Sequence, residues 1–232
     1  MSAVFASLAK AFGQLGDPAI LRVLAKCVGI TVLIFVAAGI GLYFGLGALF
    51  AWLDWNDGGF AAAAAAVVVA ALAFWFLFRV VALAVLQFFA DEIVIAVERQ
   101  HYPDLADKAR ALPFRRDLAN SLKGLGRAIG FNLLALPVAA VLIFTAFGPA
   151  IVFLLVNAVL LGRELTDMAW LRHSGNPPGP SPVAGKERFL LGGIIAAMML
   201  IPFVNLVTPI LGAAAGTHLA LDAMRRKEAT GA

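Results

Sequence analysis

Charged residues are scarce in this chain. Only 14% of its 232 residues are Asp, Glu, Lys or Arg, whereas 62% are hydrophobic, and the mean hydropathy is +0.93. A chain of this size and composition is poorly suited to fold as a water-soluble globule, because it has too few polar side chains to cover an apolar core. The composition therefore predicts a single all-α membrane domain over residues 1–232, with the lipid bilayer as a partner.

Cysteine is almost absent as well. The single Cys27 excludes an internal disulfide, a cysteine-rich metal site and an iron–sulfur cluster, and we expect it to be a packing residue. The sequence has no phosphate-binding glycine loop, no His-Glu-x-x-His motif and no nucleophile elbow. Its three histidines, His101, His173 and His218, are far apart along the chain. We therefore expect no enzymatic activity, catalytic residue, metal or cofactor.

Acidic residues are fewer than basic ones, with 14 against 18, which gives a net charge of +4. The basic residues lie between the apolar runs and do not form one patch. This pattern favours contact with lipid headgroups over nucleic acid, because cytoplasmic loops of membrane proteins are enriched in Lys and Arg. Nucleic acid is therefore not expected as a partner.

No clear cleavage site follows the apolar run from Val28 to Phe50, so we interpret this run as a retained span. Asp17 is a suitable N-cap and Pro18 suits the first helical position, which predicts a long transmembrane helix over residues 18–53. Residues 1–16 are predicted to form an amphipathic helix on the membrane surface. Its apolar side chains recur at helical spacing at Val4, Phe5, Leu8, Phe12 and Leu15.

A second long transmembrane helix is predicted over residues 60–100, because this segment also exceeds the roughly 20 apolar residues that one span needs. The turn at 54–59 has no Lys or Arg, whereas residues 101–127 are rich in both. The positive-inside asymmetry places the turn in the periplasm and the basic segment in the cytoplasm. Both ends of this helix pair are therefore expected on the cytoplasmic side of a bacterial inner membrane.

Two further apolar runs, at 128–161 and 189–221, each contain two prolines. Both the segment 162–188 and the tail 222–232 are basic and are therefore predicted to be cytoplasmic, as is the N-terminus. A run that begins and ends on one side has to turn inside the membrane, so we predict two proline-broken re-entrant hairpins, with turns near 148–149 and 205–208. The alternative is two kinked single spans with 162–188 outside the cell.

Polar residues within these runs are candidates for an ion path. Asn205 and Thr208 are the ones placed near a predicted turn, where free backbone groups of half-helices bind ions. Asn157, Thr217 and His218 are the other polar residues in these runs that are candidates to line such a path. Alternatively, these side chains form hydrogen bonds between helices and have no further role.

Charged residues at the predicted membrane exits form a second group of candidates. Glu98 and Arg99 end the second long span, and Arg163 and Glu164 follow the first hairpin. Together they are expected to form a charged network around an entrance for anions. The alternative is a set of interfacial ion pairs that only anchor the helices.

Three segments of the chain resemble a known family. They are Asp-Pro-Ala-Ile-Leu-Arg at 17–22, Leu-Gly-Arg-Glu-Leu at 161–165 and Ile-Pro-Phe-Val-Asn-Leu-Val-Thr-Pro at 201–209. With the order of two long spans and two hairpins, they resemble the CysZ-type sulfate permeases and the wider etoposide-induced protein family, over residues 18–221. The resemblance implies sulfate uptake for sulfur assimilation by an oligomer of identical subunits.

The resemblance also implies a substrate site at the start of the first span. Better-known members associate Gly-Leu-Arg with sulfate binding, and here Leu21 and Arg22 match while Ile20 replaces the glycine. Because Ile20 restricts the approach of the backbone to an anion, binding is expected to depend on Arg22 and on free amides of the helix start. Two functions remain open: permease for sulfate or a related oxyanion, and non-transporting membrane scaffold or stress-linked protein.

Overall fold

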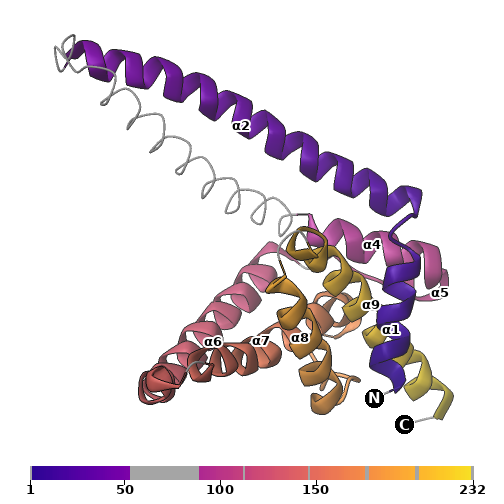
Figure 1. Cartoon of the computed structure of the whole chain (residues 1–232). Helices are drawn as coiled ribbons and strands as arrows, with labels where there is room; N and C mark the ends of the chain where they lie inside the picture. The colour runs from indigo at the N-terminus through magenta and orange to yellow at the C-terminus, as the bar shows by residue number, and fades with distance from the viewer. Residues whose placement is uncertain are drawn as a thin grey trace. The chain divides into compact units, whose positions relative to one another are not determined.

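A computed structural model describes residues 2–52, 89–111, 113–145, 147–175, 178–201 and 204–230. The described residues are almost entirely helical and include no strand, which confirms the predicted all-α class. The chain divides into two compact units, one made of Met1–Ile20 with Ala90–Ala232 and the other of Leu21–Phe89. Each unit is described by itself below, and Figure 1 gives the helix labels.

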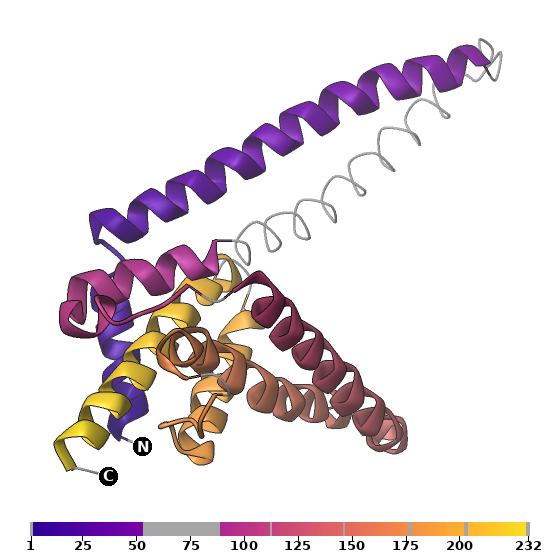
Figure 2. The ribbon, with the colours of Figure 1, turned by 180° about the vertical axis from the view of Figure 1, so that it is seen from behind.

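The chain begins with helix α1, Ser2–Gly13, which lies alongside helix α9, Val204–Thr230 (Figures 1 and 2). The buried side of α1 is made of Val4, Ser7, Leu8 and Ala11. Phe5 and Phe12 remain 56% and 50% exposed. The predicted apolar face is therefore divided, with one part packed on protein and an aromatic part left free.

Helix α2 begins at Pro18, as the Asp-Pro pair predicts, and its described part extends to Trp52. A proline fits this position because the first amide of a helix has no acceptor within the helix. The buried side chains of α2 are four residues apart and form one stripe, made of Val23, Cys27, Thr31 and Phe35. Burial of Cys27 agrees with its expected packing role.

The second predicted long span, 60–100, lies mostly outside the described residues, as does the turn at 54–59. Its described end is helix α4, Ala90–His101, which is followed by the short helix α5, Pro103–Ala106. Helix α4 packs against α9, and its buried side includes Ile93, Val94 and Val97.

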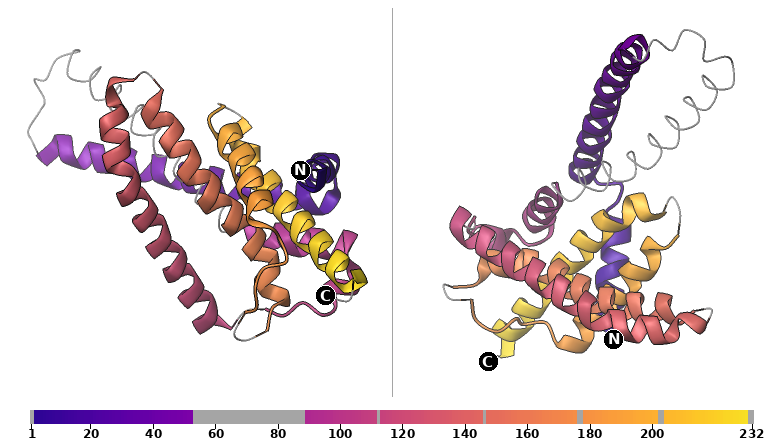
Figure 3. Two further views of the ribbon diagram at one scale, coloured as in Figure 1. Left: turned by 90° about the horizontal axis from the view of Figure 1, so that it is seen from below. Right: turned by 90° about the vertical axis from the view of Figure 1, so that its left-hand side faces the viewer.

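Helices α6, Phe114–Val141, and α7, Gly148–His173, form a helical hairpin (Figures 2 and 3). They are joined through a short 3-10 helix, η2, Leu142–Phe144, and a turn in which the amide of Gly148 donates to Oγ1 of Thr145 at 3.0 Å. A turn near 148–149 was predicted. The helices extend beyond the predicted hairpin limits of 128 and 161, because α6 begins within the predicted basic segment and α7 continues into the predicted loop.

The lengths of α6 and α7 determine whether this hairpin can cross the membrane. Helices of 28 and 26 residues are about 40 Å long, whereas the hydrocarbon layer is about 30 Å thick. Each helix is therefore long enough to cross the membrane completely. Pro137 lies inside α6 without ending the helix, as is tolerated in membrane helices whose freed carbonyl finds another partner.

The last two helices are α8, Gly185–Met199, and α9. The predicted turn at 205–208 is wrong, because α9 has already begun at Val204 and Pro209 lies inside it. The chain leaves α8 at Leu200 and Ile201 instead. The supposed tail from 222 onward is also helical, as the continuation of α9 to Thr230.

Within the described residues, three segments are long and apolar enough to span a membrane, namely Pro18–Gly41, Leu118–Phe144 and Gly148–His173. The last two belong to the hairpin of α6 and α7. Many large apolar side chains of α6 are exposed, including Leu122, Leu133, Leu134 and Val141, as expected for a surface that lipid covers. The chain is therefore a multi-pass membrane protein.

Glycines allow α7 to pack closely against α8 and α9. A Cβ atom on Gly192 of α8 would overlap with the backbone of Ala158 and Gly162 in α7. On the other side, a Cβ atom on Gly216 of α9 would overlap with the backbone of Leu165. Such close approach strengthens dispersion contacts between helices in a membrane, where the hydrophobic effect contributes little to helix association.

Replacement of Gly192 by alanine should therefore destabilise the protein, by about 1–3 kcal/mol, because the backbones of α7 and α8 would have to separate. Gly193→Ala is the matched control, since its Cβ atom would meet only Cβ of Ala158 at 3.5 Å, an ordinary contact. Unfolding of the purified variants in mixed micelles measures the difference. Equal stability of the two variants would show that the close approach does not occur.

Candidate functional site

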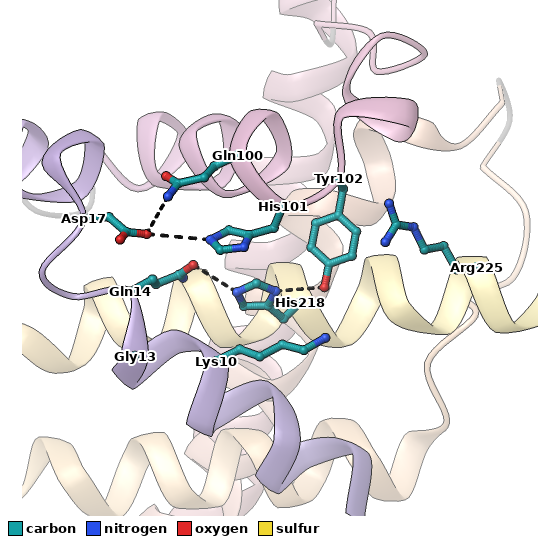
Figure 4. Close-up of a pocket in the computed structure, with 9 residues that line it drawn as sticks. All are labelled: Lys10, Gly13, Gln14, Asp17, Gln100, His101, Tyr102, His218 and Arg225. Atoms are coloured by element: carbon teal, nitrogen blue, oxygen red, sulfur yellow. Dashed lines mark hydrogen bonds and ion pairs between the residues drawn. The ribbon is translucent and has the colours of Figure 1, made fainter.

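A pocket of about 290 Å³ lies where α1, α4 and α9 meet (Figure 4). Its walls are mainly polar and charged, unlike the apolar surroundings of most membrane helices. Lining residues come from the end of α1 and the turn after it, from the end of α4 and from α9. They are Lys10, Gly13, Gln14, Asp17, Gln100, His101, Tyr102, His218 and Arg225.

Tyr102 and His218 are the centre of a buried hydrogen-bond network beside this pocket. The Tyr102 hydroxyl lies 2.8 Å from Nδ1 of His218 and donates to Oδ1 of Asp222, also at 2.8 Å. Lys10 binds the other oxygen of Asp222 at 2.7 Å. On the far side of the imidazole ring, Nε2 lies 3.0 Å from Oε1 of Gln14. The network therefore joins α1, α9 and the segment after α4.

Two cations flank the ring of Tyr102. The guanidinium carbon of Arg225 lies 4.6 Å from the ring centre, and Nζ of Lys10 lies 6.0 Å from it. Arg225 is also bonded to Asp104 of α5. Cation–π contacts of this kind contribute about 0.5–1 kcal/mol at partly exposed sites, so they help to hold the tyrosine in place.

Asp17 and His101 lie on the opposite wall of the pocket from these two cations (Figure 4). Oδ2 of Asp17 accepts a hydrogen bond from Gln100 at 2.9 Å and lies 3.7 Å from Nε2 of His101. The rings of His101 and His218 are edge to face, with their centres 5.2 Å apart. Histidines separated by more than half of the sequence are thus neighbours in the structure.

Burial and neighbouring charges alter the protonation of this network, which lies outside the three candidate spans. Burial, with the bond to Asp222, raises the pKa of Tyr102 far above its usual range, so its hydroxyl stays protonated. Burial also acts to raise the pKa of Asp222, but the bonds from Lys10 and Tyr102 outweigh it and lower that pKa. Burial, followed by His101 and Lys10, lowers the pKa of His218 to about 4, so its ring is neutral at pH 7.

A second charged cluster connects α4 with the end of α7. Glu98 is only 1% exposed. Nε and Nη2 of Arg172 each lie 3.1 Å from Oε2 of its carboxylate. Nε2 of His173 lies 3.1 Å from Oε1. Loss of one partner from such a buried pair costs about 3–5 kcal/mol, because the remaining charge is left without compensation. This cluster therefore fixes α4 on α7.

The predicted anion-entrance network does not form as a single cluster. Glu98 contacts Arg172 and His173, whereas Arg163 pairs with Asp167 at 3.2 Å. Asp167 also accepts from Arg188 of α8 at 2.8 Å. Arg99 and Glu164, the other two predicted members, are exposed.

The remaining predicted site residues lie on two different helices. Leu21 and Arg22 are exposed in the first turns of α2. Asn205 and Thr208 lie in the first turns of α9, and Oγ1 of Thr208 donates to the carbonyl of Val204 at 2.8 Å. Thr208 is fully buried, so its hydroxyl satisfies a backbone group instead of facing an open path.

Sequence reasoning missed the Tyr102 network. Its members lie in different segments, with Tyr102 and His218 separated by 116 positions. The one feature of the sequence that could indicate this network is the presence of His218 in an otherwise apolar run. The sequence alone left open whether His218 lines an ion path or forms hydrogen bonds between helices. Interhelical bonding is what the structure shows. Among the described residues, no group of three potential metal ligands lies together.

The family model described as Sulfate transporter CysZ/Etoposide-induced protein 2.4 matches residues 7–209. The chain belongs to this family. The match confirms the resemblance drawn from the segments at 17–22, 161–165 and 201–209. Comparisons with characterised proteins and with solved structures gave no match.

The family match covers the pocket only in part. Lys10, Gln14 and Tyr102 lie within residues 7–209, whereas His218 and Arg225 lie beyond the matched range. The CysZ/etoposide-induced family assignment therefore rests on α1 to the start of α9. It includes Leu21 and Arg22 at the start of α2.

Acid should weaken the packing around His218 in this family member. The ring binds a proton with a pKa near 4 when folded, against about 6.5 when unfolded. Because the unfolded state takes up the proton first, stability falls between pH 7 and pH 4, by about 2–3 kcal/mol for this residue. Unfolding at a series of pH values measures the loss.

His218→Gln is expected to make the pH dependence shallower over this range. His101→Gln should reduce it less, because burial, the main cause of the lowered His218 pKa, remains and only the contribution of His101 is lost. A His218→Gln protein with the full pH dependence of the parent would contradict the assignment. The comparison of slopes separates this effect from the acid sensitivity of Asp222, which both variants retain.

Proposed function

We propose that this protein carries sulfate or a related oxyanion across the bacterial inner membrane, in support of sulfur assimilation. The observation that carries the proposal is the match of most of the chain to a family whose description includes a sulfate transporter. Helices long enough to span a membrane agree with such a role. We propose no catalytic role, cofactor or nucleic-acid partner.

Arg22 is the residue we propose to bind the anion. It is exposed near the start of α2, four residues after the Pro18 that begins the helix. Free backbone amides and the helix dipole favour an anion at this end of a helix. The planar guanidinium adds a fork of donors that matches two oxygens of a tetrahedral oxyanion. Leu21, which precedes it, is exposed and would contribute contact area.

The path beyond this site is proposed from charge and exposure. Arg99 and Arg163 are exposed, so an anion can contact their cationic groups directly. Glu164 is exposed too, and because a carboxylate repels an anion we propose that it borders the path. Glu98, Asn205 and Thr208 were proposed for the same path. Glu98 and Thr208 have their polar atoms engaged within the protein, so we propose that they support the helices that border the path.

For the topology, we propose that both termini and the segment around 174–184 are cytoplasmic. The length of α6 and α7 allows two full crossings that return to the same side. Helix α8 has only 15 residues, or about 22 Å, which is shorter than the hydrocarbon layer. This favours a re-entrant arrangement for the last two helices. We also propose a homo-oligomer, as the resemblance to the CysZ-type permeases implies.

A second candidate function is a non-transporting membrane scaffold or stress-linked protein. The observation in its favour is the close packing of α7, α8 and α9, in which Gly192 and Gly216 bring helix backbones together. The family description also includes an etoposide-induced protein. Transport and scaffolding differ in whether the purified protein moves sulfate.

Substitution of Arg22 tests the transport proposal. Arg22→Ala should weaken sulfate binding by about 1.5–3 kcal/mol, because one charge-assisted contact is lost. Arg22→Lys should weaken it less, since the charge remains without the planar fork. Lys123→Ala, at an exposed cation on α6, is the control. Equilibrium titration and sulfate uptake into proteoliposomes are the measurements, and unchanged binding by Arg22→Ala would exclude the site.

A cysteine at position 179 tests the topology. A Cβ atom on Gly179 meets no atom within 4 Å, so the new thiol is accessible without distorting the structure. In a Cys27→Ser background, Gly179→Cys should resist a membrane-impermeant thiol reagent in right-side-out vesicles and react in inverted ones. Ready labelling in right-side-out vesicles would place this segment outside the cell.

A further inference from the structure

The pocket between α1, α4 and α9 is electrically polarised. Figure 4 shows the carboxylate of Asp17 at one end and the cationic groups of Lys10 and Arg225 at the other. Tyr102 and His218, which are neutral at pH 7, lie between these ends. A ligand that carries only one sign of charge would therefore interact favourably with only one end of the pocket.

Both charged ends keep unused hydrogen-bonding capacity. Among the described residues, Gln100 and His101 contact Oδ2 of Asp17, which leaves Oδ1 without a partner. Lys10 bonds to Asp222 and Arg225 to Asp104. An ammonium group has three donor hydrogens and a guanidinium has five, so both cations can bind an additional acceptor.

Gln14 adds a polar group to the acidic end. Tyr102 gives its only hydroxyl hydrogen to Asp222, so it must accept from Nδ1 of His218, and the neutral ring then has only a lone pair at Nε2. Gln14 satisfies this lone pair when its NH₂ group faces His218, after a half-turn of the amide. The amide oxygen of Gln14 then takes the place of the Gln14 Nε2 atom, which is buried and has no hydrogen-bond partner. Asp17 and Gln14 together make this end rich in acceptors.

Helix α1, which borders the pocket, has the pattern of a helix that lies on a membrane surface. Phe5 and Phe12 are seven residues apart on one side of α1 and are exposed, as in a helix that inserts aromatic side chains into the membrane interface. Gly13 and Gln14, which follow Phe12 directly, line the pocket. By helical spacing, Lys10 is on the other side of α1 from Phe5 and Phe12. A helix that inserted these two aromatic side chains into the interface would turn Lys10 and the pocket it lines toward the aqueous layer.

We propose that this pocket binds a small zwitterion with a primary ammonium group and an oxyanion, as in the headgroup of an ethanolamine phospholipid. The ammonium group binds at Asp17, where it donates to the carboxylate and is attracted by the amide oxygen of Gln14. The oxyanion binds at Lys10 and Arg225. This inference concerns a different site from Arg22 and does not depend on sulfate transport.

The size of the pocket agrees with such a ligand. Its volume of about 290 Å³ is at the lower limit for ligand pockets, so it accepts a headgroup and leaves the acyl chains outside. A quaternary ammonium has no hydrogen to donate, so choline headgroups should bind more weakly. Glycerol headgroups lack the cation and should also bind more weakly.

Headgroup selectivity of the unmodified protein tests the proposal without any substitution. The full-length protein is reconstituted in nanodiscs that contain equal amounts of ethanolamine, N-methylated ethanolamine, choline and glycerol phospholipids. Native mass spectrometry then identifies the lipid that is retained. We expect retention to fall by at least about tenfold from ethanolamine to choline lipids, because a charge-assisted hydrogen bond is lost. Equal retention of the two would overturn the proposal.

Matched variants then locate the site. Asp17→Asn removes the charge with little change in the size of the side chain and should abolish the preference for ethanolamine over choline, whereas Asp107→Asn, at an exposed carboxylate outside the pocket, should keep it. Arg225→Gln should reduce ethanolamine lipid retention by about tenfold, and Arg226→Gln should not. If Asp17→Asn and Asp107→Asn give the same selectivity, the pocket is not the site.

Soluble phosphoethanolamine distinguishes the source of the ligand. Displacement of bound lipid by this compound, but not by inorganic phosphate, would show that free zwitterions also bind. Failure of phosphoethanolamine to displace a selectively retained ethanolamine lipid would assign the site to membrane lipid. Equal displacement by inorganic phosphate would show that the ammonium group is not recognised and would overturn the proposal.

Discussion

The close contact of α7 with α8 and α9 is the constraint on which the rest of the larger unit depends. Gly162, Gly192 and Gly216 let helix backbones touch where any side chain would overlap with a neighbouring backbone. On a helix, residues two positions apart point in nearly opposite directions. Packing of Gly216 on α7 therefore turns His218 toward α1 and α4, which is where its partners lie.

Buried polar groups add specificity to this apolar packing. Glu98 can be buried only because Arg172 and His173 meet it, and Tyr102 only because Asp222 and His218 do. Incomplete networks of this kind are costly, so α4 has one favourable position on α7 and α9. These networks use most of the hydrogen-bonding capacity of Glu98, Tyr102 and their partners. These residues therefore stabilise the helix packing, and ligand binding depends on more exposed groups.

The two proposed binding sites both lie at helix ends. Arg22 lies at the start of α2, and the pocket opens beside the end of α1. Helix ends have free amides or carbonyls and lie near the membrane interface, where an ion keeps part of its hydration. A family of membrane proteins built from closely packed helices therefore has its best opportunities for binding small ions and headgroups at these ends.

The sequence by itself determined the membrane class, the family and the local features that one short segment encodes, such as the start of α2 at Pro18 and the turn before Gly148. It misplaced the start of α6, because the charged residues between Phe114 and Arg127 resemble a loop in composition although they form a helix. Only the tertiary structure decided that Glu98 meets Arg172 and that Tyr102 meets His218. Such pairs depend on the rotation and offset of packed helices, which close backbone contact sets and which no spacing along the chain records.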